Sequence, residues 1–343
     1  MNYWKKLTCL ALVVLCVMLS ACGTDNGGDD LPPVTQAQGA IGPDENGEII
    51  WGNQTFSVNA ETLVLNLQVR SNEKLDLSVL SLCTNLRALT IHLTVIPHIY
   101  YDKFDDPHIA DYTPTDLTPL ASLTGLEHLE LSVNKIEDLA PLAELPNLRM
   151  LVLWIEDEVE LAPLASCDQL SGLALGGRGT VDLSPLNQCA ALRSLRVDVY
   201  DSRWNTPDLS ALSGAPALET LSVGASNGLA DLIDVPLKSL VDLNDSEDIL
   251  KNLPMLDTLT NVEFSDEHLN DISPLLTHPG VTDIVLEVGK QEIENGTVVK
   301  NANDALLTTI VTNIPVEQLR EFLASGGAIT IVVDNNREAG VMK

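Results

Sequence analysis

The segment DLTPLASLTGLEHLEL (residues 116–131) decides the fold, because it recurs along most of the chain. The first copy begins 22 residues downstream of it. The close copies are DLAPLAELPNLRMLVL (138–153), ELAPLASCDQLSGLAL (160–175) and DLSPLNQCAALRSLRV (182–197), and looser copies lie at 76–91, 208–223 and 271–286. A fixed period of this size indicates units that cannot bury their own apolar face and must therefore stack on one another.

Each copy contains the spacing L-x-x-L-x-L, as at Leu126, Leu129 and Leu131. The last two leucines alternate with polar residues, which predicts a short strand with one buried face. Pairs such as Thr118-Pro119 place a side-chain acceptor before proline at the start of a helical turn. The sequence therefore predicts parallel strands on a concave face and short helical turns on a convex face.

This pattern resembles the leucine-rich repeat, and its D-[LI]-x-P-L-x-x-L form is similar to the 22-residue repeats of the internalin-type family. The resemblance implies an α/β repeat solenoid of about ten coils and a binding scaffold without catalytic activity. The predicted central strand residues are Leu67, Leu89, Leu129, Leu151, Leu173, Leu195, Leu221, Leu240, Val262 and Ile284. The Leu240 coil departs most from the pattern, because Asp242 stands where an apolar residue is expected.

One turn position also departs from the family pattern. Three residues after the last strand leucine the family carries Asn, whose side chain bonds the turn backbone from coil to coil. Asn72 and Asn134 match, whereas Glu156, Arg178, Tyr200 and Ser226 do not. We therefore expect irregular turns along that edge.

The N-terminus predicts export and lipid anchoring. Lys5 and Lys6 precede an apolar stretch, residues 7–21, which is typical of a secretory signal and too short for a permanent membrane span. The motif Leu-Ser-Ala-Cys ending at Cys22 resembles the bacterial lipobox, which implies a lipid on Cys22 after cleavage. The predicted location is the bacterial cell envelope, with the protein lipid-anchored and facing outside the cytoplasm; an ordinary signal with an incidental cysteine is the alternative.

The predicted domains follow in order. Residues 1–21 are the signal, 22–40 a lipidated cysteine with a flexible tether, 41–60 an N-terminal cap, 61–288 the repeats and 289–343 a C-terminal cap. An Asn46-Gly47 turn suggests a hairpin in the first cap. The second cap is predicted as strand, helix and strand at 306–312, 315–325 and 328–333, with a separate module as the alternative.

Composition restricts the partners. The net charge is −30, so nucleic acid, which binds by exchange of counterions for Lys and Arg, is excluded. We expect a monomer that binds a protein partner, with glycan binding as the alternative. Cys83, Cys167 and Cys189 occupy the position of Leu123 and Leu145 in sister coils, which predicts buried thiols in a core without disulfides.

Two groups of residues are candidates for a catalytic site or a metal site. His92, Glu130 and Ser132 fall on neighbouring predicted strands and could form base, orienter and nucleophile. An open concave sheet offers no water-excluding pocket, so we expect solvated polar residues there, no cofactor and no enzyme. Histidines and aspartates also gather within residues 92–115, but their spacing matches no standard metal site.

Because of the 92–115 stretch, the interval between the central strand residues Leu89 and Leu129 is 40 residues. The stretch predicts a projecting loop, or alternatively a degenerate repeat. Aromatic residues that follow three strands are predicted to share one edge. This aromatic ridge is defined by Tyr100, Tyr101, Trp154, Tyr200 and Trp204, with Met150 and Val152 as apolar neighbours and Glu130 and Asp198 as a polar rim. The resulting hypothesis is a membrane-anchored interaction protein of the cell surface, or alternatively a glycan-binding accessory lipoprotein.

Overall fold

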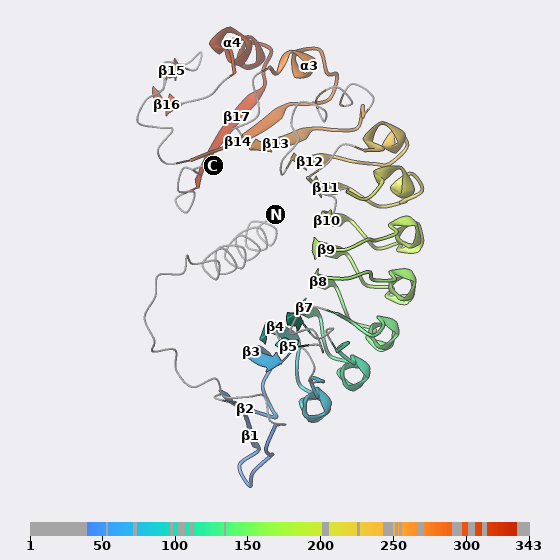
Figure 1. Ribbon diagram of the computed structural model, residues 1–343. Helices are drawn as coiled ribbons and strands as arrows, with labels where there is room; N and C mark the ends of the chain where they lie inside the picture. Colours follow the sequence, from blue (N-terminus) through green and yellow to red (C-terminus); the bar gives the residue numbers. More distant parts are fainter. Residues whose placement is uncertain are drawn as a thin grey trace.

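The computed structural model is a curved solenoid whose strands line the inside of an arc and whose helical turns line the outside (Figure 1). It describes residues 40–52, 54–70, 74–96, 99–101, 107–109, 113–133, 135–200, 206–224, 227–242, 250, 253, 256–265, 271–289, 297–300, 306–310 and 314–334. Within these residues, eleven strands form one parallel sheet. They are β3 (Thr62–Arg70), β4 (Ala88–Ile96), β7 (His128–Ser132), β8 (Met150–Ile155), β9 (Gly172–Arg178), β10 (Ser194–Tyr200), β11 (Thr220–Val223), β12 (Ser239–Asp242), β13 (Asn261–Ser265), β14 (Asp283–Gly289) and β17 (Ala328–Asp334).

The predicted leucine-rich repeat fold and its ten coils are confirmed. The predicted central residues from Leu89 to Ile284 lie opposite one another from strand to strand, the irregular Leu240 coil included. The prediction of Leu67 for the first coil is wrong, because Leu63 lies opposite Leu89 and Leu67 lies opposite Leu93. In the strand LVLNLQV every second residue is a buried-type apolar residue. A shift of four residues therefore leaves the same face buried, so the apolar pattern fits both the register that places Leu63 opposite Leu89 and the one that places Leu67 there.

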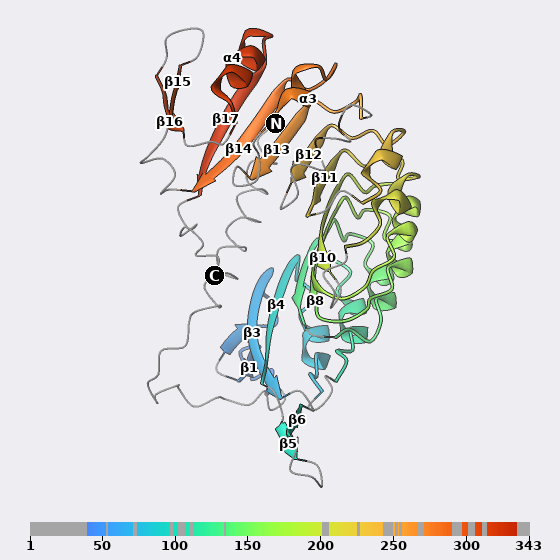
Figure 2. The same ribbon diagram turned by 45° about the horizontal axis from the view of Figure 1, so that its top comes forward.

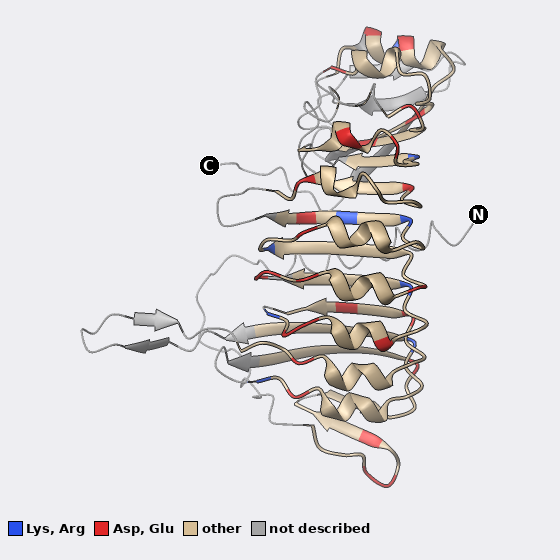
Figure 3. Cartoon of the chain, turned by 90° about the vertical axis from the view of Figure 1, so that its right-hand side faces the viewer, with Lys and Arg blue, Asp and Glu red and all other residues tan. Residues whose placement is uncertain are grey.

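The helical turns of the coils stand on the convex side. They are η1 (Ser78–Leu82), η2 (Thr118–Ser122), η3 (Ala140–Glu144), η4 (Ala162–Ser166), η5 (Ser184–Gln188), η6 (Leu209–Leu212), η7 (Leu229–Leu232) and α3 (Ser273–Leu276). Their inward leucines, such as Leu120 and Leu142, are fully buried against the strand leucines. Most of these turns carry no charge, and Lys, Arg, Asp and Glu gather where strands and turns meet (Figure 3).

The acceptor that begins most of these turns is an aspartate, not the predicted Ser or Thr. Asp116 Oδ1 accepts the backbone N–H of Thr118 at 2.9 Å, and Asp182 Oδ1 accepts that of Ser184 at 2.9 Å. Ser184 Oγ instead donates to the same carboxylate at 2.8 Å. The predicted Thr118 and Ser184 lie inside their turns, whose N-cap residues are Leu117 and Leu183, and the side-chain acceptor stands two residues earlier than predicted. The prediction failed because Ser or Thr before Pro is a strong capping signal by itself.

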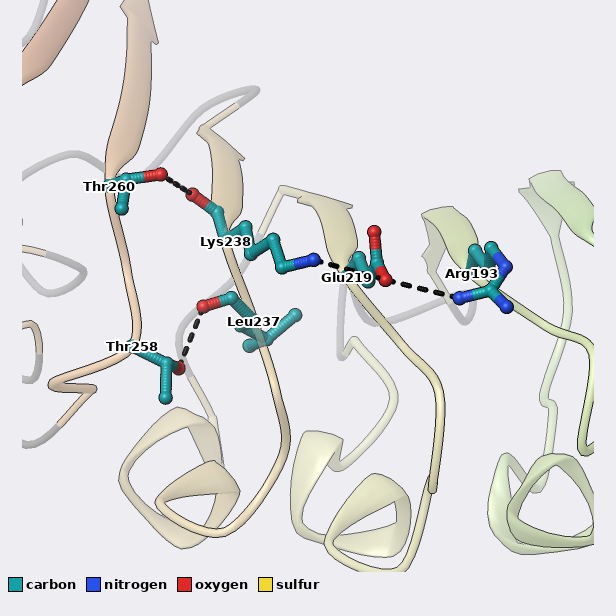
Figure 4. Close-up of polar contacts among 6 residues, drawn as sticks. All are labelled: Arg193, Glu219, Leu237, Lys238, Thr258 and Thr260. Atoms are coloured by element: carbon teal, nitrogen blue, oxygen red, sulfur yellow. Dashed lines mark hydrogen bonds and ion pairs between the residues drawn. The ribbon is translucent and has the colours of Figure 1, made fainter.

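At the edge where the strands begin, each coil is tied to the next by backbone and side chain. The Arg193 carbonyl accepts the N–H groups of Glu219 and Thr220 at 2.8 and 2.9 Å. Figure 4 shows the side chains above this ladder, where Glu219 pairs with Arg193 at 3.1 Å and with Lys238 at 3.2 Å. In the following coil Thr260 stands where the two preceding coils have the charged residues Lys238 and Glu219. Its Oγ1 donates to the Lys238 carbonyl at 3.1 Å.

The N-terminal end of the sheet is closed by an antiparallel pair, β1 (Glu48–Trp51) and β2 (Gln54–Ser57). Trp51 is 1% exposed and extends the core beyond the first coil. The Gln54 side chain accepts the Asn66 N–H at 2.9 Å and donates to the Val64 carbonyl at 3.4 Å, so it occupies part of the outer edge of β3. The turn at residues 44–47 lies between Ile41 and Ile50, which form an antiparallel bridge.

The C-terminal end follows the predicted order of strand, helix and strand, with a different pairing. α4 (Val316–Ala324) packs beside α3, and β17 pairs in parallel with β14, so these two elements take the places of an eleventh coil. Gln318 fixes the helix by donating to Asp271 at 2.6 Å and accepting the Ile272 N–H at 2.8 Å. The first strand, β16 (Leu306–Ile310), pairs instead with β15 (Thr297–Lys300).

The 92–115 stretch contains a projecting hairpin and no additional coil. β5 (Ile99–Tyr101) and β6 (Pro107–Ile109) pair antiparallel with each other, in a sheet separate from the large one. β4 pairs directly with β7, as it could not if a degenerate repeat stood between them. Figure 2 shows the hairpin extending away from the stack.

The three predicted core cysteines are buried and free, as expected. Cys167 Sγ and Cys189 Sγ lie 3.4 and 3.5 Å from carbonyls of the preceding coil, and burial raises the pKa of Cys167 to about 11. His278 occupies the same position in a later coil. Its Nδ1 accepts two backbone N–H groups at 3.1 Å, so Nε2 carries the proton and donates to Leu253 O at 3.0 Å.

Candidate functional site on the concave face

The candidate site is a group of concave residues on five adjacent strands. Two rows of opposed residues cross β4, β7, β8, β9 and β10 in register, and Met150 and Gly172 lie opposite each other in a third row. We name this group the concave patch, and its members are Thr90, His92, Glu130, Ser132, Met150, Val152, Trp154, Gly172, Ala174, Gly176, Arg196 and Asp198. The rows arise because residues between the inward leucines all face the inside of the arc.

Trp154 lies inside β8 and not after it, so the prediction that it follows its strand is wrong. It stands opposite Ser132 on one side and Gly176 on the other. β8 continues to Ile155, where the family's Asn turn is absent. β8 ends one residue before Glu156, whereas β9 and β10 continue to the corresponding positions, Arg178 and Tyr200.

The indole of Trp154 lies across β9. A Cβ at Gly176 would stand only 2.5 Å from Trp154 Cζ3, and a Cβ at Gly172 would stand 2.5 Å from Met150 Cε. Gly172 and Gly176 are accordingly buried beneath these two side chains, whereas Trp154 itself is partly exposed. The strand sequence Gly-Leu-Ala-Leu-Gly therefore leaves space for the partly exposed Trp154 indole, here called the aromatic plate, to lie against the sheet.

Glu130 is the unusual residue of the concave patch. It is 8% exposed, although it was predicted as part of a solvated polar rim. Burial raises the pKa of its carboxyl, while a side-chain hydrogen bond with Thr90 lowers it by a smaller amount. Its Oε1 is buried and makes no hydrogen bond, which is costly for a carboxylate and uncommon in folded proteins.

The neighbouring histidines are also desolvated. His92 lies opposite Ser132, as predicted, and burial lowers its pKa. Its Nδ1 is buried without a hydrogen bond, so that nitrogen orients neither Ser132 nor Glu130. Burial likewise lowers the pKa of His128, against a smaller opposing effect of the Glu127 charge. Both rings are therefore weak sources of positive charge near Glu130.

On β10, the last strand of the concave patch, two residues form an ion pair. Arg196 and Asp198 approach to 3.5 Å and are each about one third exposed. Asp198, predicted as part of a polar rim, lies on β10 opposite Gly176. Between this pair and Glu130 lie the partly exposed apolar residues Met150 and Val152, as predicted, together with Trp154.

The other predicted site residues are placed only in part. Tyr100 and Tyr101 belong to β5, and Tyr200 is the last residue of β10, opposite Arg178. Trp204 and the predicted lipidation site, Cys22, lie outside the described residues. Gly172 and Gly176 were not predicted as site residues, although the strand Gly-Leu-Ala-Leu-Gly-Gly, unusually poor in side chains, was the available signal.

In the described part of the chain, no group of three or more His, Cys, Asp or Glu could hold a metal ion. In the same residues, no helix combines the length and apolar character needed to cross a membrane.

Comparisons with known proteins give likenesses to solved structures. No protein-family model matches the chain, and no curated protein matches it. An internalin (inlF) of Listeria monocytogenes is 20% identical, covers 80% of this chain and 74% of its own, and has a TM-score of 0.39. Internalin C2 of the same species is 22% identical over 64% of this chain and 80% of its own, with a TM-score of 0.36.

A third likeness is to TLR13 in its complex with ssRNA13. It is 14% identical over 65% of this chain and 38% of its own, with a TM-score of 0.33. At these values the likenesses carry no inference about function. The leucine-rich repeat fold rests on the repeated sequence and on the register of the strands.

Proposed function

We propose that this chain is a membrane-anchored, extracytoplasmic leucine-rich repeat protein that binds a protein partner through the concave patch. The observation that carries the proposal is the partly exposed Met150–Val152–Trp154 strand on a rigid sheet, bordered by polar groups. Apolar and aromatic residues within a polar border are typical of the centre of protein interfaces. The five strands of the patch span four steps of ~4.8 Å, or roughly 19 Å, which suits a moderate interface.

Site-specific photocrosslinking tests the proposed surface. A photoreactive amino acid at Val152, on the concave face, is expected to give a discrete adduct when the intact protein is irradiated in its own cells. The matched control is Ala143, partly exposed on the convex turn of the coil that contains β8. An adduct from Ala143 together with none from Val152 would place the interface on the other face and refute the proposal.

The anchor is supported by the N-terminal sequence alone. Lys5 and Lys6, the apolar stretch and Cys22 form the export and lipidation signal described above. Cys22→Ala is expected to move the protein from the membrane fraction to the soluble fraction or to block its processing. Normal processing with unchanged membrane retention would remove the lipid anchor from the proposal.

Glycan binding is the second candidate, and the Trp154 plate favours it. A partly exposed indole on an open sheet is suited to stacking on a sugar ring, and the neighbouring polar groups could bond hydroxyls. A polysaccharide panel separates the two candidates. Affinity for a defined glycan that depends on Trp154 would favour the second, whereas a crosslinked protein with no glycan affinity would favour the first.

A further inference from the structure

The concave patch contains an acidic group whose bonding is incomplete. Glu130 is more than nine-tenths buried, and its Oε1 has no hydrogen-bond partner. The other polar contact assigned to its side chain is Thr90, on the neighbouring strand. A carboxylate has about four acceptor sites, so this one retains capacity for a donor that arrives with a ligand.

No cation stands beside this carboxylate on its own part of the sheet. Among the described concave positions of β4, β7 and β8, none is Lys or Arg. The nearest concave arginine in the same row, Arg196, is three strands away, roughly 14 Å at ~4.8 Å per strand. It is also paired with Asp198. This separation exceeds the Debye length of ~8–10 Å, beyond which salt largely screens the attraction between exposed charges.

The Cα of Trp154 stands diagonally next to that of Glu130, and the indole extends from β8 across β9, on the side of β8 away from β7. Glu130 lies opposite Val152, and Trp154 lies two residues further along the same strand. Diagonal neighbours of this kind have Cα atoms roughly 7–8 Å apart, which one flexible side chain can bridge. Tryptophan is also the most favourable ring for cations placed over its face.

From this geometry we infer that the concave patch binds a basic side chain, arginine or lysine, which lies on the Trp154 indole and directs its charge to Glu130. The inference rests on the proposed protein-binding function and specifies its partner as basic at the contact. The net charge of −30 acts in the same direction, because a strongly acidic protein attracts basic partners and accelerates their encounter.

A small probe tests the charge preference directly on the full chain. The chain has four tryptophans, so fluorinated tryptophan gives at most four ¹⁹F resonances, and Trp154→Phe assigns the one that matters. Titration with Nα-acetyl-arginine amide is expected to shift the Trp154 resonance. Nα-acetyl-citrulline amide, which has the same shape without the charge, is expected to bind about tenfold more weakly, as loss of a charge-assisted hydrogen bond predicts.

Two matched pairs of variants locate the contact. Glu130→Gln is expected to remove the tenfold preference for arginine, whereas Glu263→Gln, in the same concave row on β13, is expected to keep it. Gly176→Ala places a Cβ against the indole and is expected to weaken arginine binding about fivefold, as loss of a cation–π contact predicts. Gly172→Ala, which displaces Met150 on the same strand, is the control and is expected to change binding less.

Three outcomes would overturn the inference. They are equal affinity for the arginine and citrulline probes, no shift of the Trp154 resonance up to the solubility limit, and an arginine preference that survives Glu130→Gln. Preferential binding of neutral oligosaccharides would replace the basic side chain with a glycan. A crosslinked protein from Val152 together with equal probe affinities would retain the proposed function and remove only its basic partner.

Discussion

The carboxylates of the convex turns and the carboxylate of the concave patch behave in opposite ways. Asp76, Asp116, Asp182 and Asp271 each accept the backbone N–H two residues later. This hydrogen bond is the main cause of the lowered pKa of Asp76, Asp182 and Asp271, whereas for Asp116 the Thr118 side chain lowers the pKa most and the Thr118 backbone N–H comes second. Glu130 has an unsatisfied oxygen, and burial raises its pKa. The aspartates therefore favour the folded state when ionised, whereas ionised Glu130 opposes it.

This difference separates what every coil requires from what one region provides. A cap recurs in most coils because each turn exposes backbone N–H groups that need an acceptor. Among the described strands, no other tryptophan stands in the row of Trp154, and Glu130 has one counterpart in its row, Glu263 on β13, so the repeat itself demands neither residue. Residues that cost stability without serving the scaffold are expected at binding sites, which is why the concave patch is the better place to look for function.

The largest expected effect tests which residues of β8 face the core and which face the inside of the arc. Leu151 is fully buried, so Leu151→Ala is expected to lower the free energy of unfolding by about 2–5 kcal/mol through loss of packing and a cavity. Val152 is only partly buried on the concave face, so Val152→Ala is expected to cost less than ~1 kcal/mol. Urea denaturation followed by circular dichroism measures both. Equal losses at the two positions would mean that the strand faces are exchanged.

The stacking of the chain could be predicted from sequence because it depends on many similar residues. Leucine at three fixed positions per coil determines the buried face, and the error at Leu67 was a register shift within one face. The turn caps were displaced by two residues because Asp116 and Thr118 are both good acceptors. Local hydrogen-bond competition of this kind is decided by backbone geometry, which composition does not specify.

The concave patch could be predicted only in part. The neighbourhood of His92, Glu130 and Ser132 followed from the register, as did the concave placement of Met150 and Val152. The burial of Glu130 did not follow, because it depends on how side chains from adjacent strands close over it. The position of Trp154 across Gly176 likewise depends on a missing side chain in another coil, 22 residues later in the sequence.

A smaller effect of opposite sign is expected at Glu130. A raised folded-state pKa means that the folded protein binds the proton more tightly, so the penalty is present above that pKa and disappears as pH falls toward the ordinary value of 4.5. Glu130→Gln is therefore expected to raise stability at pH 7 by about 1–2 kcal/mol, within the range that an unsatisfied buried polar group costs. The gain is expected to vanish near pH 4.

Thermal unfolding at pH 7 and pH 4 measures this gain. Glu219→Gln is the control, because Glu219 pairs with Arg193 and Lys238, and its replacement is expected to lower stability slightly. A Glu130→Gln protein less stable than the original at pH 7 would show that this carboxylate contributes to the fold, and the contrast with the caps would then fail.

The smallest expected effect concerns one cap. Asp76 Oδ1 accepts the Ser78 N–H at 2.9 Å, and this hydrogen bond is the main cause of its lowered pKa. Asp76→Ala is expected to cost about 0.5–1 kcal/mol at pH 7, at the lower end for capping residues because the carboxylate is exposed to solvent.

The cost of Asp76→Ala is expected to depend on pH. A carboxyl with a depressed folded-state pKa stabilises the fold above the ordinary value of 3.8, and this stabilisation is lost as pH falls through the folded value. The difference between the two proteins should therefore narrow below about pH 4, in the range where Glu130→Gln also loses its gain. Melting temperatures from pH 7 to pH 3 measure both trends, and a cap deficit that grows on acidification would show that the protonated side chain is the better acceptor.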